Sequence, residues 1–242
     1  MDHNKTGLQE LDFSFAFQPI VDWRTRTVYS HEALLRGLNN ESACQVIHQS
    51  SRGQIQAFDA VCRAKAIEVA ARIGMHTPLS LNLFPGAALN VGVSLNSTIE
   101  AAHRHLFPLD QIIVEATEIE AVGDCARFAQ IVKEFRRAGM KFAIDDFGDF
   151  CSGLGLLSEL QPDIVKLGMS LVRDIHSHRP RQVIVRAIAQ VCIDLGIEIV
   201  VEGVETVDEL SWFNDLGVHL YQGYLFAKPM FEAMPFHGAD PN

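Results

Sequence analysis

The amino-acid sequence predicts an α/β fold, a TIM-like (β/α)8 barrel with an antiparallel first strand. Eight short apolar runs recur along the chain, most of them separated by helical patterns, and the first two runs lie only six residues apart. The 242 residues match the usual length of one α/β barrel domain. We therefore expect a single domain over residues 1–242, with its core at about 13–230.

The apolar runs are the expected strands, because each is short and bounded by turn or helix signals. They occupy residues 13–21, 28–35, 79–84, 111–117, 141–147, 163–168, 198–204 and 220–226. The DWRTRT link between the first two is too short for a helical crossover, so these two strands should pair antiparallel. The later runs alternate with helical patterns, which indicates parallel βαβ units.

The helical patterns are the expected crossovers. Residues 54–73 carry apolar side chains close to the 3.6-residue period of a helix. Three further expected helices, at 121–138, 181–195 and 206–216, each end just before a glycine, which is a common helix stop.

The composition narrows the class of protein. The chain is 48% hydrophobic with a net charge of −10 and a pI of 5.4, which disfavours binding to polymeric nucleic acid or an anionic membrane. The five cysteines include no CxxC pair and indicate free thiols in a reducing compartment. No signal peptide or transmembrane run is visible, so we expect a soluble cytoplasmic protein that does not use a membrane.

Most expected strands carry a conspicuous polar residue at or just past the C-terminal end. These residues are Glu32, Asn82, Glu115, Asp145, Asp146, Lys166, Glu202 and Gln222. Any one of them could be an ordinary loop residue, but in a barrel all these ends meet at one mouth. Carboxylates do not crowd together ionised without a cation, and oxygen ligands suit Mg²⁺ or Mn²⁺. The sequence therefore predicts a metal site at the mouth.

The motifs around these residues resemble the EAL family, bacterial phosphodiesterases for cyclic di-GMP named for a Glu-Ala-Leu motif, here Glu32-Ala33-Leu34. The resemblance extends over about residues 13–230. It continues through QPIV (18–21), LNLFP (81–85), VEATE (114–118), DDFG (145–148), VKLG (165–168), VEGVET (201–206) and YQGYLFAKP (221–229). It implies a barrel enzyme of second-messenger signalling, which governs biofilm formation and motility.

The resemblance implies hydrolysis of cyclic di-GMP to linear pGpG with two Mg²⁺ or Mn²⁺ ions. The implied ligands of the first ion are Glu32, Asn82, Glu115 and Asp145, and those of the second are Asp145, Asp146 and Glu202. By the same resemblance, Lys166 and Gln222 would orient the attacking water, and Glu202 would accept its proton.

The resemblance also implies substrate contacts. Arg36 would bind phosphate and Gln18 would face a guanine. Leu35, Glu205 and Pro229 complete the implied substrate-binding set, and Glu118 would steady the loop after DDFG. A homodimer is expected, and a separate regulatory protein partner stays open.

Two departures from the family pattern motivate alternatives. Residues 147–157 read FGDFCSGLGLL where the family pattern is closer to FGTGYSSLSYL, and Gly168 replaces the aspartate of Lys-x-Asp. One alternative is a catalytically impaired cyclic di-GMP receptor or protein-interaction regulator on the same fold. Another is a metallophosphoesterase for other dinucleotides. Because every implied metal ligand is present, we predict the active phosphodiesterase.

Overall fold

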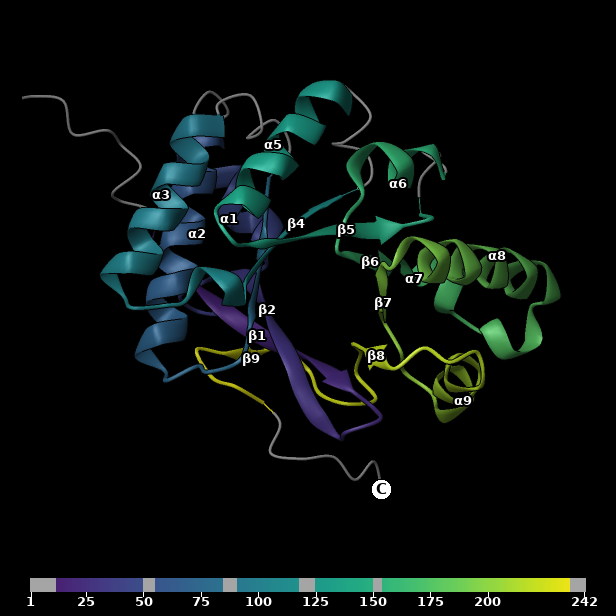
Figure 1. Ribbon diagram of the computed structural model, residues 1–242. Helices are drawn as coiled ribbons and strands as arrows, with labels where there is room; N and C mark the ends of the chain where they lie inside the picture. The colour runs from purple at the N-terminus through teal and green to yellow at the C-terminus, as the bar shows by residue number, and fades with distance from the viewer. Residues whose placement is uncertain (1–11, 50–54, 85–90, 118–124, 150–153, 236–242) are drawn as a thin grey trace, which may run out of the picture.

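Nine strands form one sheet in the part of the chain that the computed structural model describes, residues 12–49, 55–84, 91–117, 125–149 and 154–235. They are β1 (Phe13–Asp22), β2 (Thr27–Gly37), β3 (Leu79–Asn82), β4 (Ile112–Thr117), β5 (Lys141–Phe147), β6 (Ile164–Leu167), β7 (Glu198–Val201), β8 (Leu220–Tyr221) and β9 (Met230–Phe231). From β2 to β8 each strand pairs parallel with the next. Because β1 pairs antiparallel with both β2 and β8, the first eight strands close into a barrel (Figure 1). The predicted barrel, including its antiparallel first strand, is confirmed.

The helices lie outside the strands, with α2 and α3 on one side of the barrel and α8 and α9 on the other (Figure 1). Their bounds are α1 (Ala43–Gln49), α2 (Ile55–Arg72), α3 (Val91–Arg104), α5 (Cys125–Arg137), α6 (Gly155–Leu160), α7 (Met169–Val172), α8 (Arg179–Leu195) and α9 (Val207–Asp215). Two 3₁₀ turns, η2 (Leu109–Gln111) and η3 (Ile175–Ser177), complete the elements described. Of the helix expected over residues 121–138, the described part is α5, and residues 118–124 lie outside the described ranges.

Several strands end earlier than the apolar runs predict, β7 and β8 by the most. The run 198–204 is a strand only to Val201, because the chain turns at Gly203, whose φ is 64°. The run 220–226 is a strand only to Tyr221, and the chain then passes so close to the backbone of Val204 that a Cβ at Gly223 would collide with it. Glu202 and Gln222, the polar residues that directly follow β7 and β8, are therefore positioned by tight turns as well as by strands.

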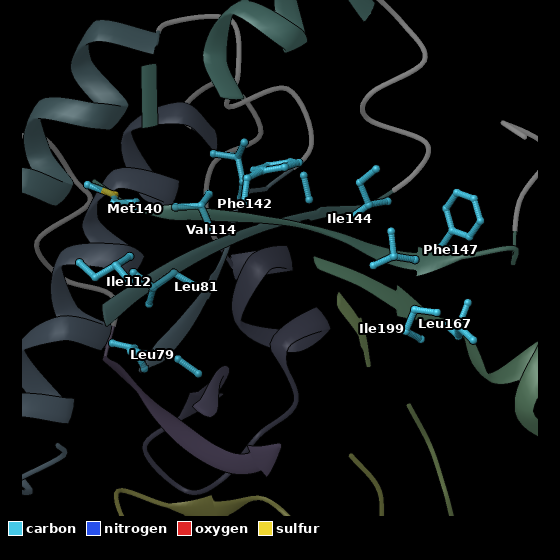
Figure 2. Packing of buried hydrophobic residues seen from close by; sticks show 14 of the residues in the cluster. Leu79, Leu81, Ile112, Val114, Met140, Phe142, Ile144, Phe147, Leu167 and Ile199 are labelled. Carbon is cyan, nitrogen blue, oxygen red and sulfur yellow. The ribbon is translucent and has the colours of Figure 1, made fainter. Parts of the chain in front are cut away.

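Two apolar clusters hold the barrel together. The larger one lies between the strands and the surrounding helices and includes the outward-facing side chains of successive strands, among them Leu81, Val114 and Ile144 (Figure 2). The smaller one fills the interior of the barrel below the C-terminal ends of the parallel strands, and we call this part of the interior the lower layer. Its members are Ile20, Ile113, Ala143, Ile164, Val200 and Leu220.

In the described ranges, none of the helices combines the length and the apolar character that crossing a membrane requires. Cys44, Cys62 and Cys192 are free thiols in the structure.

Candidate metal centre

On or just past five strands, β4 to β8, a polar residue of the mouth follows an interior apolar residue by a step of two. The pairs are Ile113 and Glu115, Ala143 and Asp145, Ile164 and Lys166, Val200 and Glu202, and Leu220 and Gln222. Side chains two apart on a strand point to the same face, so each strand that sends an apolar side chain into the lower barrel sends a polar one in above it. The reversed strand β1 obeys the same rule backwards, with Ile20 below and Gln18 above.

The adjacent carboxylates Asp145 and Asp146 break this rule. Neighbours on a regular strand point to opposite faces, yet both carboxylates reach the same group of acidic side chains. The pairing of β5 with β6 shifts register between Ile144 and Phe147, and Asp146 adopts a left-handed backbone with φ 53°. This irregularity turns the second carboxylate back to the mouth, and strained backbone of this kind is characteristic of functional sites.

Lys166 lies at the centre of the mouth and is fully buried. Its Nζ contacts four carboxylates. The distances are 3.2 Å to Glu32 Oε2, 2.8 Å to Glu115 Oε2, 2.9 Å to Asp145 Oδ1 and 2.8 Å to Glu202 Oε1. Burial alone would lower the pKa of Lys166, but these carboxylates raise it well above its ordinary value, so the ammonium stays charged.

Three amides extend this network. The Nε2 of Gln222 donates to Glu32 Oε2 at 2.7 Å and lies 3.3 Å from Gln18 Oε1. Asn82 Nδ2 donates to Glu32 Oε1 at 3.1 Å. Gln18 Nε2 in turn donates to the carbonyl of Ala227, at 3.1 Å. Glu32 is thus held in one orientation by two amides and one ammonium.

Three of the acidic side chains, Glu115, Asp146 and Glu202, are destabilised in their charged form. Burial is the main cause that raises the pKa of Glu115 to about 8, with Lys166 opposing and Glu32 adding to the effect. Burial, followed by the charge of Asp145, also raises the pKa of Glu202 well above its usual range and that of Asp146 to about 6. Carboxylates that resist ionisation together would be relieved by a nearby cation.

The donor set fits divalent cations. Carboxylate oxygens of Glu32, Glu115 and Asp145 lie within 4.8 Å of one another, and so do those of Asp145, Asp146 and Glu202. Asp145 belongs to both groups. Its buried Oδ1 is close to the Lys166 ammonium but accepts no hydrogen bond from the described residues, which leaves it available as a ligand.

The formal charges of the mouth lead to the same conclusion. The five carboxylates and the ammonium of Lys166 carry a formal charge of −4 when all are ionised, which is the charge of two divalent cations with opposite sign. All ligand atoms are oxygens, as Mg²⁺ and Mn²⁺ prefer.

Two cavities open at the carboxylates. One, of about 320 Å³, is lined by Glu32, Asp145, Asp146, Glu202 and Gln222, together with Gln18 and Glu205. The second, of about 240 Å³, contains Glu32 and Asn82 and extends over Leu35 to Arg36. Because Glu32 lines both, a ligand bridging the two cavities would pass the acidic groups.

The family model described as "EAL domain" matches residues 4–229 of the chain. The chain belongs to the EAL domain family. The expected resemblance is thereby confirmed over nearly all of the sequence.

Curated EAL relatives differ in what their names say they do. The blue light- and temperature-regulated antirepressor BluF of Escherichia coli (strain K12) is 33% identical over 222 residues, which are 91% of this chain and 55% of BluF. The cyclic di-GMP phosphodiesterase PdeR of the same organism is 29% identical over 88% of this chain and 33% of its own length. The chain therefore spans little more than half of one relative and a third of the other.

Solved EAL structures share the fold. A standalone versatile EAL protein from Vibrio cholerae O395, in its c-di-GMP-bound form, is 44% identical with a TM-score of 0.88 and covers 93% of this chain and 95% of its own. Klebsiella pneumoniae BlrP1, in a complex with manganese and cyclic di-GMP, is 36% identical with a TM-score of 0.85, over 96% of this chain and 58% of BlrP1.

Some residues expected from the EAL resemblance lie away from the acidic groups. Exposed Glu205 is at the rim of the larger cavity, where Arg173 pairs with it at 2.8 Å. Pro229 is half-buried just before β9 and lines neither cavity. Arg36 donates to the carbonyl of Leu35 at 2.7 Å. Glu118 lies outside the described residues.

A buried ion pair beneath the smaller cavity was not expected from the sequence. Arg63 and Asp59, one turn apart on α2, are both almost fully buried and form a salt bridge. Asp59 Oδ1 also accepts the backbone N–H of Phe84 at 2.8 Å, two residues after Asn82. The Asp–Arg spacing of four residues, which places both side chains on one face of the helix, was the available signal.

Proposed function

We propose that this EAL domain is a divalent-metal-dependent phosphodiesterase that hydrolyses cyclic di-GMP to linear pGpG. The observation that carries the proposal is the pair of acidic groups that share Asp145. Two divalent cations held there would acidify a water and balance the charge of the phosphodiester. The named phosphodiesterase relative and the nucleotide-bound neighbours support this substrate class.

The residues that would hold the ions follow from the two groups. Glu32, Glu115 and Asp145 would hold the first, and Asp145, Asp146 and Glu202 the second. Asn82 is assigned to the first group because its amide already lies against Glu32, and exchange of its nitrogen and oxygen by rotation would present an acceptor oxygen.

The remaining polar residues would handle the water. The Lys166 ammonium and the Gln222 amide both donate towards Glu32 and would hold a water oxygen beside it. Glu202, ionised once cations neutralise the site, would take the proton from that water at a carboxylate oxygen. Lys166 cannot act as the base, because its surroundings keep it protonated.

The two cavities would divide the substrate between them. Arg36 would bind a phosphate with its planar guanidinium, and Leu35 would pack beside it in the smaller cavity. Gln18 and Glu205 would contact a guanine in the larger cavity, and Pro229 would contribute from the segment that leads into β9.

Product analysis tests this proposal. The purified chain is incubated with cyclic di-GMP and Mn²⁺ or Mg²⁺, and the nucleotides are separated by chromatography. Accumulation of pGpG that stops on addition of a chelator is expected. A folded protein that binds the cations and leaves the substrate intact would contradict it.

BluF motivates a second candidate, a regulator on the same fold that acts through a partner protein. Calorimetry separates the two candidates. Cyclic di-GMP that binds in the presence of Mg²⁺ without turnover favours a receptor, and absence of any nucleotide binding favours a regulator that contacts only protein. A panel of other dinucleotides tests whether the activity is confined to cyclic di-GMP.

A further inference from the structure

The carboxylate of Asp149 occupies the space that a side chain at Gly168 would fill. A Cβ built on Gly168 would lie 2.5 Å from both Cγ and Oδ1 of Asp149, far inside van der Waals contact. Gly168 itself has φ −66° and ψ 157°, an extended conformation that any residue adopts at a helix N-cap. A side chain at position 168 would therefore displace the Asp149 carboxylate from its present place, whereas the backbone itself does not demand glycine.

Asp149 replaces the missing N-cap of α7. Gly168 has no side chain with which to cap the helix, but Asp149 Oδ1 accepts the backbone N–H of Ser170 at 3.1 Å. The chain that carries Asp149 is also joined to this turn by a hydrogen bond from the Gly168 N–H to the Phe147 carbonyl, at 3.1 Å. The cap thus comes from the segment that follows Asp145 and Asp146.

Helix α7 lies between the two chain segments that carry the second acidic group, one with Asp145 and Asp146 and the other with Glu202. On one side, a Cβ at Gly148 would collide with the side chain of Leu171. On the other, a Cβ at Gly203 would lie 2.6 Å from Met169 Cγ. Gly148 follows Asp146 by two residues and Gly203 directly follows Glu202, so this single turn touches both segments that carry the acidic side chains.

We propose that Asp149 is a positioning residue: its carboxylate fixes α7 to the Asp145–Asp146 segment, and α7 in turn sets the spacing between that segment and Glu202. This chain has glycine at position 168, where the family pattern has aspartate, and it supplies the N-cap carboxylate from position 149. The inference rests on the metal centre of the proposed function, but its test does not depend on turnover.

A swap of the carboxylate between the two positions tests this. The variants are Asp149→Ala, Gly168→Asp and the double variant, and the readouts are Mn²⁺ affinity by calorimetry without nucleotide and the unfolding temperature without metal. Asp149→Ala should weaken Mn²⁺ binding by about tenfold or more, as loss of a group that orients metal ligands does. It should also lower the unfolding temperature by about 2–4 °C, because one cap is lost.

The effect of Gly168→Asp on Mn²⁺ affinity is expected to change sign when Asp149 is replaced by alanine. Gly168→Asp alone should weaken Mn²⁺ binding, because its side chain meets Asp149, whereas in the Asp149→Ala background it should restore affinity to within about threefold of the parent. If Gly168→Asp alone does not fold, Gly168→Ser serves the same purpose, since its Cβ meets the same carboxylate. Asp110→Ser, an exposed aspartate before β4, is the control for charge and should change neither readout.

Unchanged Mn²⁺ affinity in Asp149→Ala would overturn the inference, even if the unfolding temperature falls, because that result describes a purely structural cap. Failure of the double variant to recover would overturn it as well. If the parent chain binds Mn²⁺ and the variants behave as expected, but the parent hydrolyses no cyclic di-GMP, only the proposed function is contradicted. A parent chain without Mn²⁺ affinity contradicts both.

Discussion

The lower and upper layers of the barrel interior are built on the same strands, two residues apart, and have opposite chemistry. In the lower layer, side chains such as Ile164 and Val200 pack against one another and need no polar partner. In the upper layer, Lys166 of β6 and Glu202, which directly follows β7, meet at 2.8 Å among further carboxylates. The lower layer therefore stabilises the barrel, whereas the upper layer holds charges that are costly unless cations neutralise them.

The largest effect is expected at the one residue shared by both acidic groups. Asp145→Ala removes a ligand from each group and should lower the rate of pGpG formation at least about a thousandfold, on the scale of losing a group that acts in the transition state. Initial rates at saturating Mn²⁺ measure this. Glu198→Ala, an exposed carboxylate at the other end of β7, is the matched control. Activity within tenfold of the parent would show that the upper layer does not carry the chemistry.

Replacement of the central ammonium should separate charge from packing. Lys166→Met keeps the length of the side chain but leaves four carboxylates without their buried partner, so the free energy of unfolding should fall by about 3–5 kcal/mol without metal. Added Mn²⁺ should recover part of that loss, because cations can neutralise the carboxylates in its place. Urea unfolding with and without Mn²⁺ is the measurement. Equal losses under both conditions would contradict the charge argument.

A cavity in the lower layer should affect stability alone. Ile164→Ala removes a buried side chain directly below Lys166 and should lower the free energy of unfolding by about 2–4 kcal/mol. Mn²⁺ affinity of the folded protein should change little, since no ligand is lost. Chemical denaturation and calorimetry on the same sample test this. A large loss of Mn²⁺ affinity would mean that the two layers are not independent.

The smallest effect concerns a buried carboxylate outside both layers. Glu209 of α9 accepts the backbone N–H groups of Glu205, Thr206 and Asp174. Burial would raise its pKa, but these donors lower it overall, the opposite of the rise at Glu115. Because the pKa is lower in the folded state, the resulting stability is present above the unfolded-state pKa and is lost as the pH falls through the folded-state value.

Glu209→Gln should therefore cost about 1 kcal/mol of unfolding free energy at pH 7, as loss of a cap does, and the difference from the parent should shrink in acid. Denaturant midpoints between pH 7 and pH 3 measure it. A difference that grows towards low pH would show that the sign of the pKa shift is wrong.

The sequence was sufficient to predict most of the fold, because apolar runs and glycine stops are local signals. The antiparallel first strand followed from the six-residue link after it. The strand ends were predicted less well, since β7 ends at the turn at Gly203 and β8 ends where Gly223 passes close to the backbone of Val204, which is an arrangement made in three dimensions.

The candidate site was predicted as a set of residues but not as an arrangement. The step of two places Glu115 and Lys166 above the lower layer without further information. The bulge that brings Asp146 to the side of Asp145 depends on pairing between β5 and β6, and no residue type marks it in the sequence. The replacement of a side chain at Gly168 by Asp149 likewise needs the distance between two loops.

Anomalous diffraction from crystals soaked in Mn²⁺ tests the central claim, that two cations share Asp145 at the mouth of the barrel. We expect two peaks about 3.5–4 Å apart, each within about 2.5 Å of an oxygen of Asp145. A single peak, or peaks that do not meet at Asp145, would contradict the account.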